Sequence, residues 1–507
     1  MVVSIRRKNR AVTPYRLTLW LIVVLVGGLF YVQHAPLRMD AQPATHDGVE
    51  ITREAGGDIV IVLDYDAIRT SGATFEERNW SAAWINVIEQ EIGPVTIATP
   101  TTLSQRTLEG ARVIILTSSV ADQIDDSLLR TLRQWVLDGN LLLSDQPKGA
   151  LREAFSADGR AGSRRGQQIT FARDLPDPFA VQLQAMPLST SYIGSTSARE
   201  GATTLMSIDG APAIYAASIG KGTVITFDFD LGEQLVALQQ GKPTQGFTVR
   251  PRSRPGESTP RTEDLILDDK LRGASIPYAD LLERFLVWGV IARYAGTPGY
   301  WYFPDGAKGA VILLHEDSRL GDGGGWMLEH ENEHKAFSTL LTSIDAGLTK
   351  EGAEAIHRRG GEIGLLWRLS NTPEEVREPV GVRGINPFLR PVDLEPQLDD
   401  LRKTLPVGYV RTSRTVDGWW STRWSDPFRE LAHQGIRIDT SYAVAGTSGF
   451  AFGTGIPFQV FDDTGMPLGV RELPVIVPSN AIDGPSLEAL LEQSSAGHHQ
   501  VIAIFTD

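Results

Sequence analysis

Two adjacent acidic side chains directly follow a predicted β-strand in the C-terminal half of the chain. The apolar run 310–315, AVILLH, is typical of a buried strand, and Glu316 and Asp317 come immediately after it. One carboxylate at such a strand end can bind a divalent metal ion while the other takes a proton from the metal-bound water. The pair therefore predicts a hydrolytic site. The alternative is an ordinary polar strand end whose carboxylates accept hydrogen bonds from nearby backbone amides.

A second group with metal-binding spacing is the pentapeptide HENEH at 330–334, which matches the pattern HExxH. On a helix, residues four apart lie on one face, so His330 and His334 could hold zinc while Glu331 acts as base on a zinc-bound water. Charged residues surround both histidines, which is instead typical of a solvated helix face. A third hypothesis is that the histidines supply a metal site shared with the strand-end acids.

Aromatic side chains gather in the stretch DGWWSTRW, which contains Trp419 and Trp420. Aromatic rings in a loop at the mouth of a barrel suit stacking against sugar rings, so both tryptophans are candidate substrate-binding residues. The alternative is that they pack in the core.

The order of motifs across about 300–507 resembles the polysaccharide deacetylases, a family of metal-dependent carbohydrate esterases built on a distorted (β/α) barrel. Five stretches carry the resemblance, in order: HEDS, HRRGGEIGLLWRLS, VRTSR, GIRIDTSY and ELPV. The resemblance implies a barrel of this type at 299–507.

The resemblance also implies roles for particular residues. Glu316 would be the base that activates water, Asp317 a metal ligand, and Arg411 the residue that orients the base. Two histidine ligands would fall at positions occupied here by Leu366 and Ser370. A carboxylate alone does not make a closed site for zinc or a similar divalent ion. The metal is therefore expected only if the site is active, and a degenerate site is an open alternative.

The N-terminal half shows a different α/β alternation at 58–240. Continuous apolar strands alternate with amphipathic helices, which predicts a parallel sheet covered on both faces. The stretches ARVIILTSS, LLRTLRQWVLDGNLLLSD and IGKGTVITFDFDLG resemble class I glutamine-amidotransferase-like accessory domains, which implies a doubly wound, flavodoxin-like domain. Active amidotransferases need a cysteine nucleophile, and this chain has no cysteine. Ser118 or Ser119 occupies the strand-end turn, and we expect a non-catalytic module.

The first residues of the chain resemble a membrane anchor. A basic segment at 1–16 precedes the apolar segment 17–36, which is nearly long enough to cross a bilayer and predicts an N-terminal transmembrane helix. A cleaved signal peptide is the alternative. A polar linker at 37–57 would lead to the body of the protein. The expected localisation is single-pass in the cytoplasmic (inner) membrane, with an extracytoplasmic, periplasmic body.

Two further segments complete the expected organisation. A Pro-, Arg- and Ser-rich loop or linker spans 241–275, and a strongly apolar bridging helix spans 276–298. The 507 residues carry a formal net charge of −14, which disfavours nucleic-acid binding. The absence of cysteine excludes disulfides and thiolate metal sites.

The expected function is that of a membrane-anchored polysaccharide deacetylase-like protein that acts on, or binds, an acetylated cell-envelope polysaccharide. The first alternative is a non-catalytic glycan-binding or scaffold protein of envelope assembly. The second is a zinc metallopeptidase that uses the HENEH segment.

Overall fold

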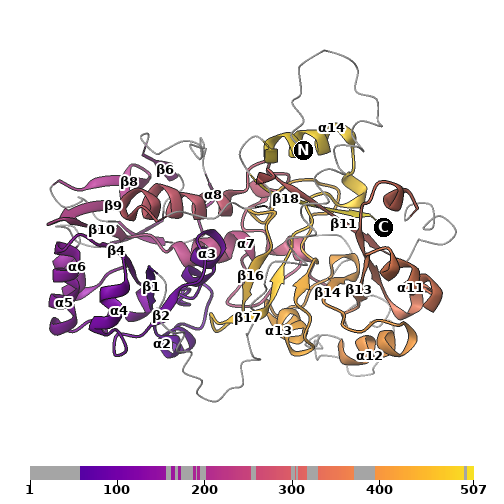
Figure 1. Cartoon of the computed structure of the whole chain (residues 1–507), viewed down its shortest axis with the longest axis horizontal. Coiled ribbons are helices and arrows are strands. Elements are labelled where there is room, and N and C mark those ends of the chain that lie inside the picture. The colour runs from indigo at the N-terminus through magenta and orange to yellow at the C-terminus, as the bar shows by residue number, and fades with distance from the viewer. Residues whose placement is uncertain are drawn as a thin grey trace, which may run out of the picture.

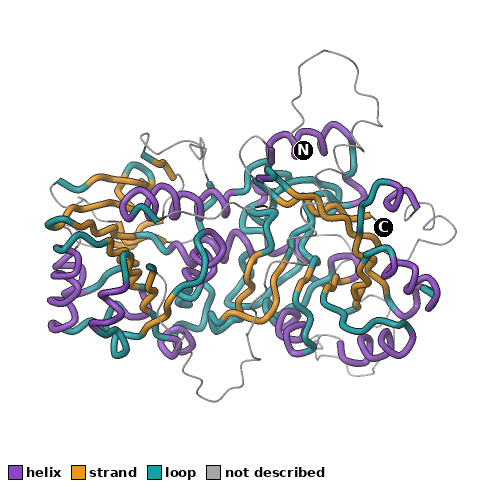
Figure 2. The backbone as a smooth tube through the Cα atoms, in the orientation of Figure 1, coloured by secondary structure: helices purple, strands orange, loops and turns teal. Residues whose placement is uncertain are grey.

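The structure is a computed structural model in which two sheets lie side by side, one formed by each half of the chain (Figure 1). It describes residues 58–155, 162–165, 169–172, 186–189, 191–194, 201–252, 259–297, 303, 306–316, 329–369, 394–495 and 499–506. Figure 2 shows strands inside each half and helices around them. The protein is therefore an α/β protein, as the sequence predicts.

The first sheet has eight strands in the order β2-β1-β3-β4-β10-β9-β8-β6. The first five strands of this order are parallel, and they follow the 2-1-3-4-5 order of flavodoxin-like sheets. The last three continue the sheet in antiparallel fashion. The strands are β1 (Ile59–Val62), β2 (Thr96–Ala98), β3 (Val113–Leu116), β4 (Leu141–Asp145), β6 (Ile169–Phe171), β8 (Thr203–Ile208), β9 (Ala211–Ile219) and β10 (Gly222–Phe227). The strands β5 (Gly162–Arg165) and β7 (Ser191–Gly194) form a separate pair.

Helices cover both faces of the first sheet, which explains why its strands are apolar without alternation. One face packs against α4 (Gln105–Gly110), α5 (Asp126–Leu137) and α6 (Gly149–Phe155). The other packs against α2 (Tyr65–Thr70), α3 (Ala83–Glu91) and α7 (Leu231–Gln239).

The second sheet also has eight strands, in the order β16-β17-β15-β14-β13-β12-β11-β18, and every pair except β16–β17 is parallel. The strands are β11 (Ala310–Glu316), β12 (Ser338–Thr342), β13 (Glu362–Trp367), β14 (Thr412–Thr415), β15 (Ile438–Asp439), β16 (Phe458–Phe461), β17 (Pro467–Glu472) and β18 (Val501–Thr506). The helices of this half are α11 (Lys350–Arg358), α12 (Leu394–Thr404), α13 (Asp426–His433) and α14 (Gly484–Gln493).

The second sheet is strongly curled. The guanidinium carbon of Arg414 in β14 lies 4.0 Å from the ring centroid of Phe505 in β18. These strands are four places apart in the sheet, which would separate them by about 19 Å if it were flat. The chain after β17 reaches back to β18 through an isolated bridge between Val477 and Ile504 and a few backbone hydrogen bonds beside it, and the contact does not extend into a continuous ladder. The sheet is therefore a curled half-barrel rather than a closed barrel.

The predicted fold class is wrong in two respects. Among the described residues, no helix is both long and apolar enough to cross a membrane, and the segment 17–36 lies outside those residues. The predicted N-terminal transmembrane helix is therefore withdrawn, together with the inner-membrane localisation and extracytoplasmic body that depended on it. The predicted distorted barrel is the open, curled sheet described above, because no continuous ladder joins its two edges.

The two halves share one hydrophobic core. The bridging helix is α8 (Tyr278–Arg284), which continues as a π-helical stretch at Phe285–Ala292 and ends in α9 (Arg293–Ala295). Its apolar side chains belong to the same buried cluster as side chains of both sheets. The predicted linker 241–275 is also ordered where it is described: Thr248 pairs with Arg423, and Arg261 pairs with Trp419. It therefore packs onto the second half rather than forming a free tether.

A buried aromatic cluster lies where the two halves meet. Trp424 of the second half has its ring centroid 5.7 Å from that of Trp80 and 5.6 Å from that of Phe75, both in the first half. Phe461 in β16 approaches Trp80 at 6.4 Å. Edge-to-face arrangements of this kind add to the free energy gained from burying the rings.

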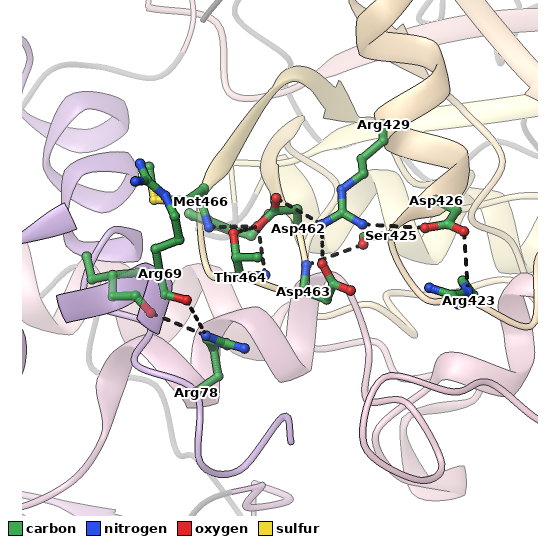
Figure 3. A network of polar contacts seen from close by, with 12 residues as sticks. Arg69, Arg78, Arg423, Ser425, Asp426, Arg429, Asp462, Asp463, Thr464 and Met466 are labelled. Carbon is green, nitrogen blue, oxygen red and sulfur yellow. Dashed lines mark hydrogen bonds and ion pairs between the residues drawn. The ribbon is translucent and has the colours of Figure 1, made fainter. Parts of the chain in front are cut away.

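Polar contacts continue the interface beside this cluster (Figure 3). In the first half, Arg78 donates to the carbonyl of Ser71 at 2.8 Å and to that of Arg69 at 3.1 Å. In the second half, Arg429 of α13 forms ion pairs with Asp462, at 3.0 Å, and with Asp463. These acids begin the turn 462–466 between β16 and β17, so α13 holds the turn that faces the first half.

The turn fits against the first half because Gly465 has no side chain. Gly465 has a φ of +78°, and a Cβ there would lie 2.8 Å from the carbonyl oxygen of Asn79. We therefore expect Gly465→Ala to lower the free energy of unfolding by about 1–3 kcal/mol. Gly210→Ala is the matched control, because Gly210 has the same φ of +78° and a Cβ there meets nothing within 4 Å. Urea unfolding measures both; equal stability of the two variants would contradict this docking.

Burial of Asp280 in α8 predicts a pH dependence of stability. Burial raises the pKa of Asp280 from 3.8 to about 6, although the nearby Arg284 opposes the shift. Between these values the folded protein holds a proton that the unfolded chain releases, so stability falls as the pH rises through this window. The loss between pH 4.5 and pH 7 is about 2 kcal/mol for this group.

Asp280→Asn removes the titrating proton and should flatten this part of the pH profile. Urea unfolding of wild type and variant at both pH values measures the difference in slope. Parallel profiles for the two proteins would show that Asp280 ionises normally in the folded state.

Candidate functional site

Glu316 ends β11 on the inner, concave side of the curled sheet. Side chains alternate along a strand, and Ala310 and Leu314 of β11 lie in the inner apolar cluster with Phe505. Glu316 shares their side and is half-buried. Asp317 lies outside the described residues, so its predicted role as metal ligand stays a prediction.

The structure does not bring Arg411 to Glu316. Arg411 precedes β14, is exposed, and its carbonyl accepts hydrogen bonds from the backbone of Arg437 and Ile438. It therefore lies at the amino end of a strand, whereas Glu316 lies at the carboxyl end of a parallel strand. These ends are opposite edges of the sheet, so Arg411 is not placed to orient Glu316.

Arg414 is the arginine of the VRTSR stretch that points to the inner side. It is 6% exposed, donates to the carbonyl of Thr440, and lies against the ring of Phe505. Phe505 and Glu316 share the inner side, so Arg414 lies on the side of the sheet that the role expected of Arg411 requires. The alternation of side chains distinguishes the two arginines, but only once the strand is known to begin at Thr412.

The position expected for the first histidine ligand is part of an apolar layer. Leu366 of β13 is 3% exposed and belongs to the inner cluster with Leu314 and Leu341. Aliphatic side chains cannot bind a metal ion, so the ligand set of the family is not reproduced at this position. Ser370 lies outside the described residues.

Glu331 of the HENEH segment is turned toward the protein and contacts His315 on the convex side of the sheet. Its Oε1 lies 2.6 Å from Nε2 of His315, and its Oε2 accepts a hydrogen bond from Ser338 at 2.8 Å. His315 is 3% exposed, and its Nδ1 lies 2.5 Å from the hydroxyl oxygen of Thr506 in β18. This network fixes the segment to the carboxyl end of β11, and it leaves Glu331 poorly placed to act as base for a metal on the outer face.

His330 and His334 do lie together, on the outer face of the same turn. Their ring centroids are 4.5 Å apart, and the ligand atoms of His330, Glu333 and His334 all lie within 4.8 Å of one another. The pairing expected from the four-residue spacing is therefore present. The third residue in this group is Glu333, which the sequence predicted to be part of a solvated helix face.

The two candidate sugar-stacking tryptophans are buried. Trp420 is 0% exposed, and its ring packs against Phe428 and Tyr442. Trp419 is 7% exposed, and the Arg261 guanidinium covers its ring at 4.7 Å. Neither ring offers an open face, so the structure favours the core-packing alternative for both.

A groove of about 600 Å³ lies elsewhere on the second half. It is formed by the segment 273–275 before α8, the loop after β15, the segment after β17, and α14. Hydroxyl, amide and small side chains predominate in its lining: Gly273, Ser275, Gly446, Thr447, Ser448, Asn480, Ala481, Ile482, Asp483, Ser486, Ala489, Leu490 and Gln493. No motif pointed to this groove, because its residues come from three separate loops and a helix.

The strand-end serines of the first half form a structural network. Ser118 accepts a hydrogen bond from Asn79 at 3.1 Å, and its backbone amide donates to Asp145 at 3.3 Å. Burial raises the pKa of Asp145 well above its usual value, which favours a neutral acid that does not activate a hydroxyl as a base would. Ser119 accepts from the backbone of Asp64 at 3.0 Å. These contacts tie neighbouring strand ends together.

Comparisons with known proteins do not assign the chain to a family. No protein-family model matches it, and no curated protein is similar to it in sequence. Three solved structures with partial similarity are the beta-galactosidase Gan42B of G. stearothermophilus, an exo-beta-1,4-mannosidase of Opitutaceae bacterium strain TAV5, and a cytoplasmic protein of Salmonella typhimurium.

All three similarities are distant. The beta-galactosidase is 13% identical, with a TM-score of 0.27 over 36% of this chain and 29% of its own. The mannosidase is 17% identical, with a TM-score of 0.25 over 35% and 32%. The Salmonella protein is 14% identical, with a TM-score of 0.25 over 34% and 88%. The matches cover less than a third of either glycosidase, and at these scores they support no conclusion about fold or activity.

The different placement of the two arginines can be tested by mutation. Arg414→Met removes a buried hydrogen bond to Thr440 and a cation from the inner side of the sheet. We expect a loss of more than about 2 kcal/mol in the free energy of unfolding. The exposed control Arg411→Met should change it by less than about 0.5 kcal/mol. Urea unfolding measures the free energy of unfolding of both variants. A larger loss of stability in Arg411→Met than in Arg414→Met would contradict the burial of Arg414 and the exposure of Arg411.

Proposed function

We propose that the C-terminal half is a deacetylase-like domain that binds an acetylated polysaccharide. The observation that carries the proposal is the groove of about 600 Å³ beside α14. A volume of this size accommodates a small-molecule ligand or a few sugar units. The five motifs that resemble the deacetylases support the same class of ligand.

The chemistry of the lining suits sugars. Hydroxyl and amide side chains such as Ser275, Thr447 and Asn480 can donate and accept hydrogen bonds to sugar hydroxyl and acetamido groups. The groove residues include no lysine or arginine, which makes a phosphate or other strongly anionic ligand a poor fit. Ile482 is 44% exposed and offers an apolar surface for a methyl group or a sugar face.

The position of the groove supports the proposal as well. The loop 446–448 and the segment 480–483 belong to the connections that leave the carboxyl ends of the parallel strands β15 and β17. Ligands of parallel α/β sheets bind at this edge. Glu316 ends β11 at the same edge.

Binding without turnover is favoured by the apolar surroundings of Leu366. A metal-bound water needs ligands that this strand does not provide. One observation favours deacetylation as a second candidate: His330, Glu333 and His334 lie close enough to one another to hold a divalent ion.

Calorimetric titration with an N-acetylated oligosaccharide and with its deacetylated counterpart tests the proposal. Ala489→Trp should abolish or strongly weaken binding, because Ala489 lines the groove and a large ring there fills it. Glu488→Trp is the control, since Glu488 is exposed on the same helix but does not line the groove.

Measurement of released acetate separates the two candidates. Binding without release supports the proposal, and release at a metal-dependent rate supports deacetylation. Failure of wild type to bind either oligosaccharide, or equal binding by Ala489→Trp, would rule out the groove as a polysaccharide site.

A further inference from the structure

The outward-facing side chains of the HENEH turn are arranged as a chelating group. Nδ1 of His330 lies 3.7 Å from Oε2 of Glu333, and the ring of His334 stands at 83° to that of His330. We propose that His330, Glu333 and His334 bind a borderline divalent cation, with Zn²⁺ the best-suited ion. This inference does not depend on polysaccharide binding, and it differs from the predicted peptidase site in its carboxylate.

The separation of the ligand atoms suits a small ion. Tetrahedral ligands about 2.1 Å from zinc lie about 3.4 Å apart. The three ligand atoms are within 4.8 Å of one another, so small side-chain rotations bring them to this spacing without movement of the backbone. The i, i+3 and i, i+4 positions on one helical turn make such rotations compatible with the helix.

The backbone that carries these ligands is held in place by other contacts. Glu331 is bound to His315 and Ser338 on the inner side of the turn. The amide of Ala336 donates to the carbonyl of Glu331 at 2.8 Å, and Lys335 adopts a φ of +55° that ends the helix. None of these contacts uses a proposed ligand atom. A site whose supporting residues are already fixed binds an ion with less ordering of the protein.

The donor set selects the class of ion. Two imidazoles and one carboxylate favour zinc and neighbouring transition metals, whereas Ca²⁺ and Mg²⁺ prefer oxygen ligands alone. The side chains of His330 and Glu333 are 47% and 73% exposed. The ion therefore keeps access to solvent, and water completes the fourth position.

The inward orientation of Glu331 separates this site from a metallopeptidase. In a peptidase of the HExxH type, the glutamate between the histidines acts on the metal-bound water. Here both oxygens of Glu331 are engaged by His315 and Ser338. Glu333 then supplies the carboxylate ligand of the ion. We expect the ion to bind without peptide cleavage.

Isothermal titration of the full chain with ZnCl₂, together with metal analysis after dialysis, tests the proposal. We expect one zinc ion per chain, no measurable site in the H330A/H334A double variant, and at least about tenfold weaker binding in Glu333→Gln, since even outer-shell changes cost this much. Substitution with Co²⁺ should give the visible absorption of a four-coordinate ion.

His357→Ala is the matched control, because His357 is exposed on α11 and lies outside the chelating group. Circular dichroism of each variant confirms that it is folded. The proposal is overturned if the folded double variant binds zinc as wild type does, if Glu333→Gln has no effect, or if His357→Ala reduces binding equally.

Discussion

The buried side chain of Gln240 joins the two halves of the molecule. Its amide donates to the carbonyl of Phe461 at 2.7 Å and accepts from the amide of the same residue at 2.7 Å. Its backbone carbonyl accepts from Tyr442 at 3.0 Å and from Trp424 at 3.3 Å. Gln240 is 1% exposed, so losing any of these partners would leave buried polar atoms unsatisfied. The contact holds the end of α7 against β16, and the aromatic cluster excludes water around it.

Because of this interface, the two sheets differ in how much of their carboxyl edge is open to a ligand. The carboxyl edge of the first sheet lies beside the second half: the turn with Gly465 contacts Asn79, whose side chain donates to Ser118. The serines and Asp145 at that edge are used in holding strand ends together. The second sheet instead has a groove lined by the connections after β15 and β17 and by α14. Ligand binding is therefore expected in the second half.

The sequence predicts elements better than it predicts contacts. The runs 59–62, 113–116 and 310–315 are identifiable as strands because burial on both faces makes them continuously apolar. The direction of an arginine is harder to infer, since one residue of uncertainty in a strand's start reverses the side on which each side chain lies. The role of Arg411 was expected from the resemblance of the VRTSR stretch alone, and the structure places Arg414 of that stretch on the inner side.

Long-range contacts account for the remaining differences. The spacing of His330 and His334 was sufficient to predict that their rings meet, because the contact is within one helical turn. The inward turn of Glu331 depends on His315 in β11, and no local pattern reveals that partner. The burial of Trp420 likewise depends on Tyr442 in a distant loop. The groove beside α14 is assembled only by the fold.

A crystal structure of the protein soaked with an N-acetylated oligosaccharide would show whether the groove beside α14 binds sugar. We predict ordered sugar density in the groove, within hydrogen-bonding distance of side chains such as Asn480 and Ser275, and an intact acetyl group if binding is not followed by turnover. Clear sugar density at another surface, with the groove filled by solvent, would contradict the account.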